Sequence, residues 1–241
     1  MTGISPELDD VFVVNVKKFV ERRKFMQEQL ARTGIEAEFV LDWDSDELTP
    51  EIVAEYFTGD AVSPAQMSCA LKHVTVLQRI AERGGKHNLV LEDDAILAPE
   101  FVQGLNHAIQ ESADFPGPKV IFIGSGGNFY TPKSMREPGR HLYAMHKGRF
   151  TDSYMIDAET AKLRLDWIHR HRMDGPIDNQ FDKMDKELGI KLLWLEDPVV
   201  EQGSKTGMFD TSIEKALPSW LQAWSFFWEK MRRKYLYQLW R

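Results

Sequence analysis

The stretch that decides the fold of this chain reads Asn88-Leu89-Val90-Leu91-Glu92-Asp93-Asp94-Ala95-Ile96-Leu97. Its apolar first half is typical of a strand buried on both faces, as in the parallel sheet of an α/β protein. Such sheets bind ligands beyond the carboxyl ends of their strands, where the three acids would lie. In an extended chain Glu92 and Asp94 point to one side and Asp93 to the other. Two carboxylates so placed can hold a hard divalent cation, although for an acidic triplet alone a solvated turn is the simpler interpretation.

The composition is that of a globular protein with one large domain. The chain has 241 residues, of which 43% are hydrophobic and 28% charged, and this length suffices for a full α/β core. The formal net charge of −7 argues against nucleic-acid binding, which needs a basic face. The single cysteine, Cys69, excludes an internal disulfide and a multi-cysteine zinc site. Neither a secretory signal nor an uncharged apolar run of ~20 residues is present, so a cytoplasmic location is expected.

Alternating patterns before and after the acidic stretch predict strands and helices in turn, as in α/β folds. Strands are expected at 11–16, 38–41, 119–124, 142–145, 153–156 and 191–195, and helices at 19–31, 63–83, 99–111, 157–170 and from 176 onward. The clearest start signal is Ser63-Pro64-Ala65-Gln66, with a capping serine, a proline in first position and a glutamine three residues after the cap. Residues 201–207 predict a hydroxyl-bearing loop with one lysine that could wrap a diphosphate, although most such loops are only connections.

Several polar side chains are candidates for a site, and each has a plainer alternative. Asn15 ends the first strand, and with Lys17 and Arg22 it could meet a nucleotide base and phosphates at a strand-to-helix crevice; an exposed basic helix face is the alternative. His73 lies beside an apolar helical stripe, where a packed core histidine is the commoner role. Asp178 falls in the first turn of its helix, where it would also complement the helix dipole.

Taken together, these pieces resemble glycosyltransferase family 25, the lipopolysaccharide-biosynthesis and related galactosyltransferases. The runs that carry the resemblance are Val14-Asn15-Val16-Lys17 with Glu21-Arg22-Arg23, Cys69-Ala70-Leu71-Lys72-His73, Leu91-Glu92-Asp93-Asp94, Thr151 with Tyr154, Pro176-Ile177-Asp178 and Gln202-Gly203-Ser204. Their order and spacing extend the resemblance over about residues 11–213.

The resemblance implies a GT-A-type fold over residues 1–213, with a Rossmann-like, mostly parallel central sheet flanked by helices. It further implies inverting, metal-dependent transfer of a hexose, galactose in the first place, from a UDP-sugar to a lipopolysaccharide, lipooligosaccharide or related glycan. Glu92 and Asp94 would bind Mn²⁺ or Mg²⁺, which would neutralise the departing UDP. The residues expected to bind the donor are Asn15, Lys17, Arg22, His73, Asp93, Gln202, Gly203 and Ser204.

An inverting transfer also needs a base that deprotonates the acceptor hydroxyl. The resemblance points to Asp178, at the family's Pro-Val-Asp position, and Asp152 is its rival. The chain departs from the family pattern at three places. Ser68 stands where the family usually has glycine, Lys72 where it usually has serine, and Phe150-Thr151-Asp152 replaces the common Gly-Thr-His. These departures leave the sugar and the acceptor open. The alternatives are transfer of glucose or an N-acetylhexosamine, or a catalytically silent glycan-binding or membrane scaffold protein with the same fold.

Residues 214–241 lie beyond the resemblance and predict an amphipathic helix. One face is mostly aromatic and comprises Leu217, Trp220, Leu221, Trp224, Phe227, Trp228, Met231, Tyr235 and Leu239. The segment has a net charge of +4, which suits an interfacial helix on anionic lipid. Peripheral contact with the inner face of the cytoplasmic membrane is therefore expected through 217–241, near a lipid-linked acceptor. Packing on its own domain or on a second subunit is an equal alternative.

Overall fold

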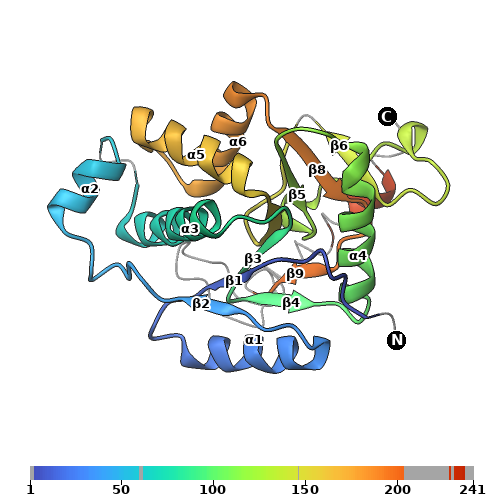
Figure 1. The fold of residues 1–241 in the computed structure, drawn as a ribbon, viewed down its shortest axis with the longest axis horizontal. Helices are drawn as coiled ribbons and strands as arrows, with labels where there is room; N and C mark the ends of the chain where they lie inside the picture. The colour runs from blue at the N-terminus through green and yellow to red at the C-terminus, as the bar shows by residue number, and fades with distance from the viewer. Residues whose placement is uncertain (1–2, 60–61, 146, 204–227, 229–230, 237–241) are drawn as a thin grey trace.

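A computed structural model describes residues 3–59, 62–145, 147–203, 228 and 231–236 of the chain (Figure 1). Its centre is a seven-stranded sheet in the order β2-β1-β3-β7-β5-β8-β6. These strands are β1 (Val11–Val14), β2 (Glu38–Val40), β3 (Asn88–Glu92), β5 (Lys119–Phe122), β6 (Leu142–Met145), β7 (Ser153–Ile156) and β8 (Lys191–Leu195). Strands β2, β1, β3, β5 and β8 run in one direction, whereas β7 and β6 are antiparallel to their neighbours. The predicted α/β fold with a mostly parallel sheet is confirmed.

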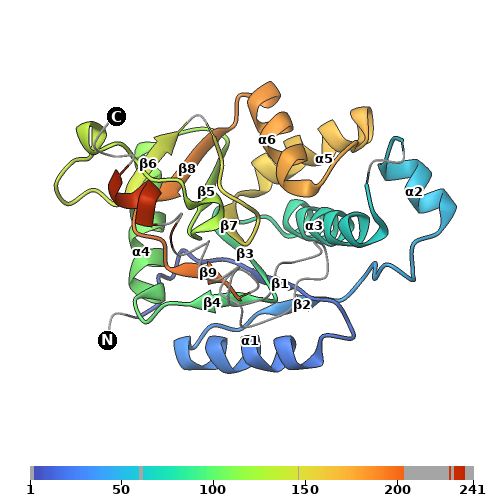
Figure 2. The ribbon, with the colours of Figure 1, turned by 180° about the vertical axis from the view of Figure 1, so that it is seen from behind.

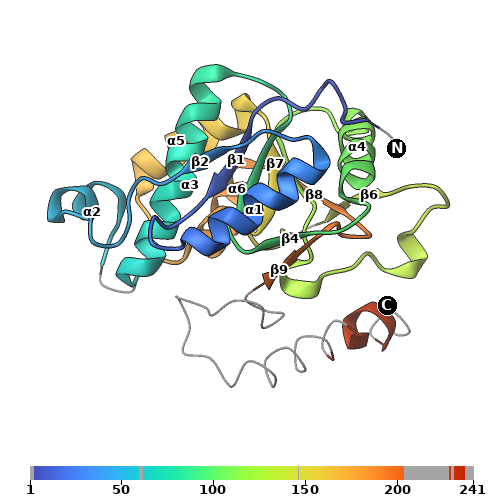
Figure 3. The ribbon, with the colours of Figure 1, turned by 90° about the horizontal axis from the view of Figure 1, so that it is seen from below.

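Helices cover both faces of this sheet (Figures 1 and 2). They are α1 (Val20–Thr33), α2 (Pro50–Tyr56), α3 (Pro64–Arg83), α4 (Phe101–Glu111), α5 (Ala158–His171) and α6 (Ile177–Leu188). Alternation along β1 divides the core, because Phe12 and Val14 pack towards α3, α5 and α6, and Val11 and Val13 pack towards α1 and α4. Figure 3, seen from the side of α1, shows this helix lying across the strands. Shorter helical turns are η1 (Ser112–Asp114), η2 (Gly126–Asn128), η3 (Lys133–Met135) and η4 (Arg232–Leu236).

Helix α3 begins where the sequence predicts. The Ser63 hydroxyl accepts a hydrogen bond from the Gln66 backbone N–H, and the Gln66 side chain accepts one from the Ser63 N–H at 2.9 Å. Pro64, at the first helical position, has no N–H that would need a partner. The capping box predicted from Ser63 and Gln66 is therefore confirmed. The helix packs on one face of the sheet and ends at Arg83, and β3 follows after a short connection.

Two local expectations are wrong. The acidic triplet is not extended, because β3 ends at Glu92, and Asp93 and Asp94 form a turn into β4 (Ala95–Leu97). Glu201 and Gln202 belong not to a loop but to β9 (Val200–Gln202), which pairs antiparallel with β4. Both differences have one cause: β4 needs a partner for its backbone hydrogen bonds, and the segment that supplies it is about a hundred residues away in the sequence.

Most of the predicted C-terminal amphipathic helix, residues 214–241, lies outside the described residues. At Lys234, which is described, the ammonium lies 3.7 Å from Asp197 Oδ1 and 5.7 Å from the centre of the Tyr130 ring. Trp228, Met231 and Tyr235 are exposed. Among the helices that the structure describes, none is long and apolar enough to cross a membrane.

A buried ion pair joins α5 to α6. Arg164 Nε and Nη2 donate to the two Asp185 oxygens at 2.8 and 2.6 Å, and both side chains are almost fully buried. We expect Arg164→Met to lower the free energy of unfolding by about 3–5 kcal/mol, because it leaves the Asp185 carboxylate buried without its partner. Urea unfolding followed by circular dichroism measures this loss. The double variant Arg164→Met/Asp185→Leu should recover most of it, and a single-variant loss under about 1 kcal/mol would contradict the argument.

Candidate active site

A cavity of about 370 Å³ opens at the carboxyl ends of β1 and β3. Their parallel register places Val14 beside Glu92, so the residues that follow each strand lie at the same edge of the sheet. The polar and charged residues that line the cavity are Asn15, Arg22, Gln66, Ser68, Lys72, Glu92, Asp93, Asp94, Thr151, Asp178, Asn179 and Gln202. The structure thus brings most of the predicted site residues to one cavity, at the edge where open α/β sheets bind ligands.

Asp93 joins the start of α1 to the acidic turn. Its Oδ2 accepts a hydrogen bond from Asn15 Nδ2 at 2.7 Å, and its Oδ1 accepts one from Arg22 Nη1 at 2.9 Å. The Arg22 guanidinium also lies over the Phe19 ring, 4.6 Å from its centre. Burial raises the pKa of Asp93, and the Arg22 charge opposes that rise. Asn15 and Arg22 therefore contact Asp93 and reach the cavity wall together with it.

Glu92 and Asp94 bring two carboxyl groups to the same cavity. Burial, and next the Asp94 charge, raise the pKa of the Glu92 carboxyl. Thr151 Oγ1 donates a hydrogen bond to Glu92 Oε1 at 2.9 Å, which holds that oxygen in place. A divalent cation would relieve the repulsion between the buried Asp94 carboxylate and the half-buried Glu92 carboxylate, and oxygen donors are what Mg²⁺ and Mn²⁺ prefer. The two side chains therefore fit the predicted cation.

Asp178 lies in the first turn of α6, half-buried at the cavity wall. Its Oδ1 accepts a hydrogen bond from the Thr151 backbone N–H at 2.8 Å. Burial, and next the Glu92 charge, raise the pKa of Asp178. Thr151 thus holds two carboxylates at once, with its N–H on Asp178 and its hydroxyl on Glu92. A carboxylate with a raised pKa is the stronger proton acceptor, which suits a general base.

Asp152 has a different environment. It is fully buried and is not among the described residues that line the cavity. Gly124 and Gly126 pack against its carboxylate so closely that a Cβ on either glycine would lie 1.9 or 2.5 Å from a carboxylate oxygen. Burial raises the pKa of Asp152 well above its ordinary value. Because Asp152 is fully buried whereas Asp178 lines the cavity, Asp178 is the stronger candidate for the base.

Lys17 and the Gln202 segment differ in their relation to the cavity. Lys17 is not among the described residues that line the cavity. Its ammonium pairs with Glu47, and this hydrogen bond raises the pKa of Lys17. Its backbone N–H donates to Asp44 Oδ2. Gln202 does line the cavity, and the Gly203 N–H donates to the Asp94 carbonyl at 2.7 Å. The third residue of that predicted motif, Ser204, lies outside the described residues.

His73 is fully buried and is not among the described residues that line the cavity, in agreement with a packed core histidine. Its ring packs edge-on against Phe181, and its Nδ1 lies 3.1 Å from the Tyr154 hydroxyl. Burial lowers the pKa of His73 to about 4, so the ring is neutral at neutral pH. Its Nε2 nevertheless points to the site, 3.7 Å from Glu92 Oε1.

Two cavity residues had no role predicted from the sequence. Thr151 entered the sequence analysis only as part of a family motif. Nothing in the neighbouring sequence indicates that it donates hydrogen bonds to both Glu92 and Asp178. Lys72 is buried; its ammonium lies 2.8 Å from Asp44 Oδ1 and 2.6 Å from the Asp42 carbonyl. Helical spacing places Lys72 on the same face of α3 as Cys69. It cannot reveal the acidic partner of Lys72, because Asp44 lies 28 residues earlier in the chain.

Sequence comparisons relate this chain to known glycosyltransferases. The family model "Glycosyltransferase family 25 (LPS biosynthesis protein)" matches residues 8–179. A glycosyltransferase 25 family member of Drosophila melanogaster is 27% identical over 128 residues, which are 48% of this chain and 21% of the relative. A putative glycosyltransferase of Acanthamoeba polyphaga mimivirus is 28% identical over 174 residues, which are 65% of this chain and 52% of the relative. The chain therefore spans about a fifth and about half of the length of these curated relatives.

Three solved structures are similar at low sequence identity. Mouse xyloside xylosyltransferase 1 is 13% identical, with 77% of this chain and 71% of that chain covered and a TM-score of 0.42. The inositol-1-phosphate CTP transferase of T. maritima is 9% identical, with 95% and 98% covered and a TM-score of 0.44. A glycosyltransferase involved in glycosylation of the PBCV-1 major capsid is 10% identical, with 92% and 100% covered and a TM-score of 0.38.

Proposed function

The chain belongs to glycosyltransferase family 25, and from this premise we propose that it is a metal-dependent, inverting hexosyltransferase that takes galactose from a UDP-sugar. Its Rossmann-like α/β fold is of the GT-A type, and the family implies a nucleotide-sugar donor and a glycan acceptor. The observation that carries the finer proposal is the meeting of Glu92, Asp94 and Asp178 at one cavity beyond the ends of β1 and β3.

In this proposal Glu92 and Asp94 would hold Mn²⁺ or Mg²⁺. The cation would supply Lewis-acid stabilisation of the charge that develops on the departing UDP. Asn15 and Arg22, tied to Asp93, would orient the nucleoside at the start of α1. Gln202 lines the same cavity from β9 and would also contact the donor. The donor would thus be held between the first strand-to-helix turn and β9.

Proton transfer in this proposal falls to Asp178. Its carboxylate would take the proton of the acceptor hydroxyl as that oxygen attacks the anomeric carbon and the bond to UDP breaks. The Thr151 N–H holds Oδ1 of Asp178 and so fixes the orientation of the carboxylate at the cavity wall. Since Thr151 also holds Glu92, the base and the cation site would keep a constant separation.

We propose a lipopolysaccharide or lipooligosaccharide as the acceptor, extended at the inner face of the cytoplasmic membrane. The description of the family as "LPS biosynthesis protein" supports this acceptor class. Peripheral membrane contact is supported by exposed Trp228, Met231 and Tyr235, which lie in the same short segment as Arg232. Aromatic and cationic side chains in one segment suit an anionic lipid surface.

A panel of UDP-sugars tests the donor. With Mn²⁺ present, the preferred donor at about 100 times its Kd should stabilise the protein by about 2.7 kcal/mol, which raises the Tm by roughly 5–10 °C. UDP-galactose should give the largest shift, ahead of UDP-glucose and UDP-N-acetylhexosamines, and EDTA should remove it. Release of UDP in the presence of a lipooligosaccharide acceptor then measures transfer. A folded protein that neither binds nor turns over any of these donors would be a silent scaffold, and the proposal would be wrong.

A further inference from the structure

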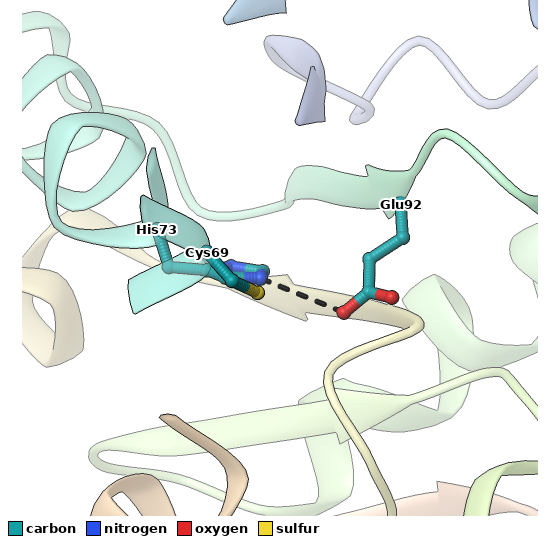
Figure 4. Close-up of side chains that lie close together, drawn as sticks. All are labelled: Cys69, His73 and Glu92. Carbon is teal, nitrogen blue, oxygen red and sulfur yellow. Dashed lines mark ion pairs between the residues drawn. The ribbon is translucent and has the colours of Figure 1, made fainter. Parts of the chain in front are cut away.

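Three side chains of different chemistry converge where α3 passes the end of β3 (Figure 4). Cys69 and His73 are four residues apart on α3 and therefore share one face of the helix. Glu92 is the last residue of β3. The thiol sulfur, one ring nitrogen and one carboxylate oxygen all lie within 4.8 Å of one another. This combination of sulfur, nitrogen and oxygen donors differs from the all-carboxylate pair of Glu92 and Asp94.

The His73 ring is oriented as a metal-binding imidazole would be. Its buried Nε2 has no hydrogen-bond partner among the described residues and lies 3.7 Å from Glu92 Oε1. A buried polar atom without a partner is costly, so a ligand there would stabilise the arrangement. Metal-bound histidines commonly donate their other N–H to a neighbouring oxygen, and the Tyr154 hydroxyl lies 3.1 Å from Nδ1.

We propose that Cys69, His73 and Glu92 form a second metal site, one that takes a thiolate- and imidazole-binding ion such as Zn²⁺. Zinc binds such donors tetrahedrally at about 2.0–2.3 Å, which places ligand atoms roughly 3.3–3.6 Å apart. The observed 3.7 Å between His73 Nε2 and Glu92 Oε1 needs only a small contraction. On binding, the Cys69 thiol releases its proton to solvent and the sulfur binds as thiolate. Since Cys69 and Glu92 both line the cavity, the fourth position is open to water.

Occupation of this site would interfere with the donor cation, because both sites use Glu92. A bound Zn²⁺ would draw the Glu92 carboxylate towards α3 and neutralise part of the charge that attracts Mn²⁺. It would also compete with Thr151 for Oε1, the oxygen that accepts the Thr151 hydroxyl hydrogen bond. Zn²⁺ is therefore an inhibitor that competes with Mn²⁺. This competition rests on the proposed function, whereas the binding of Zn²⁺ does not.

Titration of the purified, metal-free chain with Co²⁺, a spectroscopic substitute for Zn²⁺, tests the binding. Because Cys69 is the single cysteine, a thiolate-to-cobalt charge-transfer band in the near ultraviolet can arise only from Cys69. We expect this band to saturate at one equivalent and to disappear on addition of Zn²⁺. If the wild-type protein shows no such band, the site does not exist.

Variants assign the remaining ligands. Cys69→Ser should abolish the band, and both Cys69→Ser and His73→Gln should weaken Zn²⁺ binding, measured by competition with a zinc indicator, by at least about 100-fold, since loss of even an outer partner costs about 10- to 100-fold. His107→Gln, which alters a histidine stacked on His141 away from the site, is the matched control and should keep the wild-type affinity. Thermal unfolding without metal shows whether each variant is folded. If a variant does not fold, the cobalt band of the wild-type protein alone tests whether the site exists. Equal Zn²⁺ affinity in folded His73→Gln would overturn the assignment.

The competition has its own measurement. Transfer rates at fixed Mn²⁺ are followed as Zn²⁺ is added, and each protein is compared with its own rate without Zn²⁺. Cys69→Ser should need at least about 100-fold more Zn²⁺ for half-inhibition, and more Mn²⁺ should relieve inhibition of the wild type. Equal inhibition of both proteins would overturn the competition. Absence of any transfer by the wild type would count against the proposed function alone, because the cobalt band does not depend on turnover.

Discussion

Asp94→Asn should lower the rate of sugar transfer by about 10³-fold or more, because it removes one of the two charges that would hold the donor cation. A loss of about 4 kcal/mol of Lewis-acid stabilisation corresponds to that factor. The amide has nearly the same volume as the carboxylate, and the Asp94 carbonyl keeps its hydrogen bond from Gly203. The fold should therefore remain intact, and the loss should appear in turnover and in the apparent affinity for Mn²⁺.

The measurement is the steady-state rate of UDP release as a function of Mn²⁺ concentration. Asp46→Asn is the matched control, since Asp46 is an exposed acid in the segment before α2 and lies outside the cavity. It should keep the wild-type metal dependence. Wild-type rates for Asp94→Asn at low Mn²⁺ would show that Asp94 does not hold the cation.

Local signals in the sequence were enough to predict the elements that carry the site. The capping box at Ser63 predicts the start of α3, and the apolar run before Glu92 predicts β3; both are confirmed. Asp157 likewise caps α5, its side chain accepting from the Thr160 N–H at 2.6 Å. Each of these signals depends on residues within one turn or one strand, so it can be read without knowledge of the rest of the chain.

Contacts between distant segments could not be predicted in this way. Asp93 is held by Asn15 and Arg22, which are 78 and 71 residues away; the parallel register of β1 and β3 brings them together. The turn at Asp93 and Asp94 depends on β4 finding β9. The burial of Asp152 depends on Gly124 and Gly126, which nothing near Asp152 in the sequence indicates. The sequence therefore predicts which strand ends carry the site, and tertiary pairing decides which carboxylates face the cavity.

Asp178→Asn should lower kcat by about 10²- to 10⁴-fold, the usual range for loss of a general base. The reason is that Asp178 lines the cavity and would be that base. Donor binding should persist, so the thermal shift with UDP-sugar and Mn²⁺ should remain close to that of the wild type. The Thr151 N–H can still donate to the amide oxygen of the variant, which preserves the geometry of the wall.

The pH dependence separates the two candidate bases. A base acts when deprotonated, and burial raises the pKa of Asp178. The wild-type rate should therefore fall as the pH falls through that raised pKa, at a higher pH than for an ordinary carboxylate. Asp178→Asn should lose this acidic limb from the residual rate, whereas Asp152→Asn, which alters a buried carboxyl packed against Gly124 and Gly126, should retain it. The reverse result, with the limb lost only in Asp152→Asn, would make Asp152 the base and would require this buried carboxyl to become accessible before the acceptor can react.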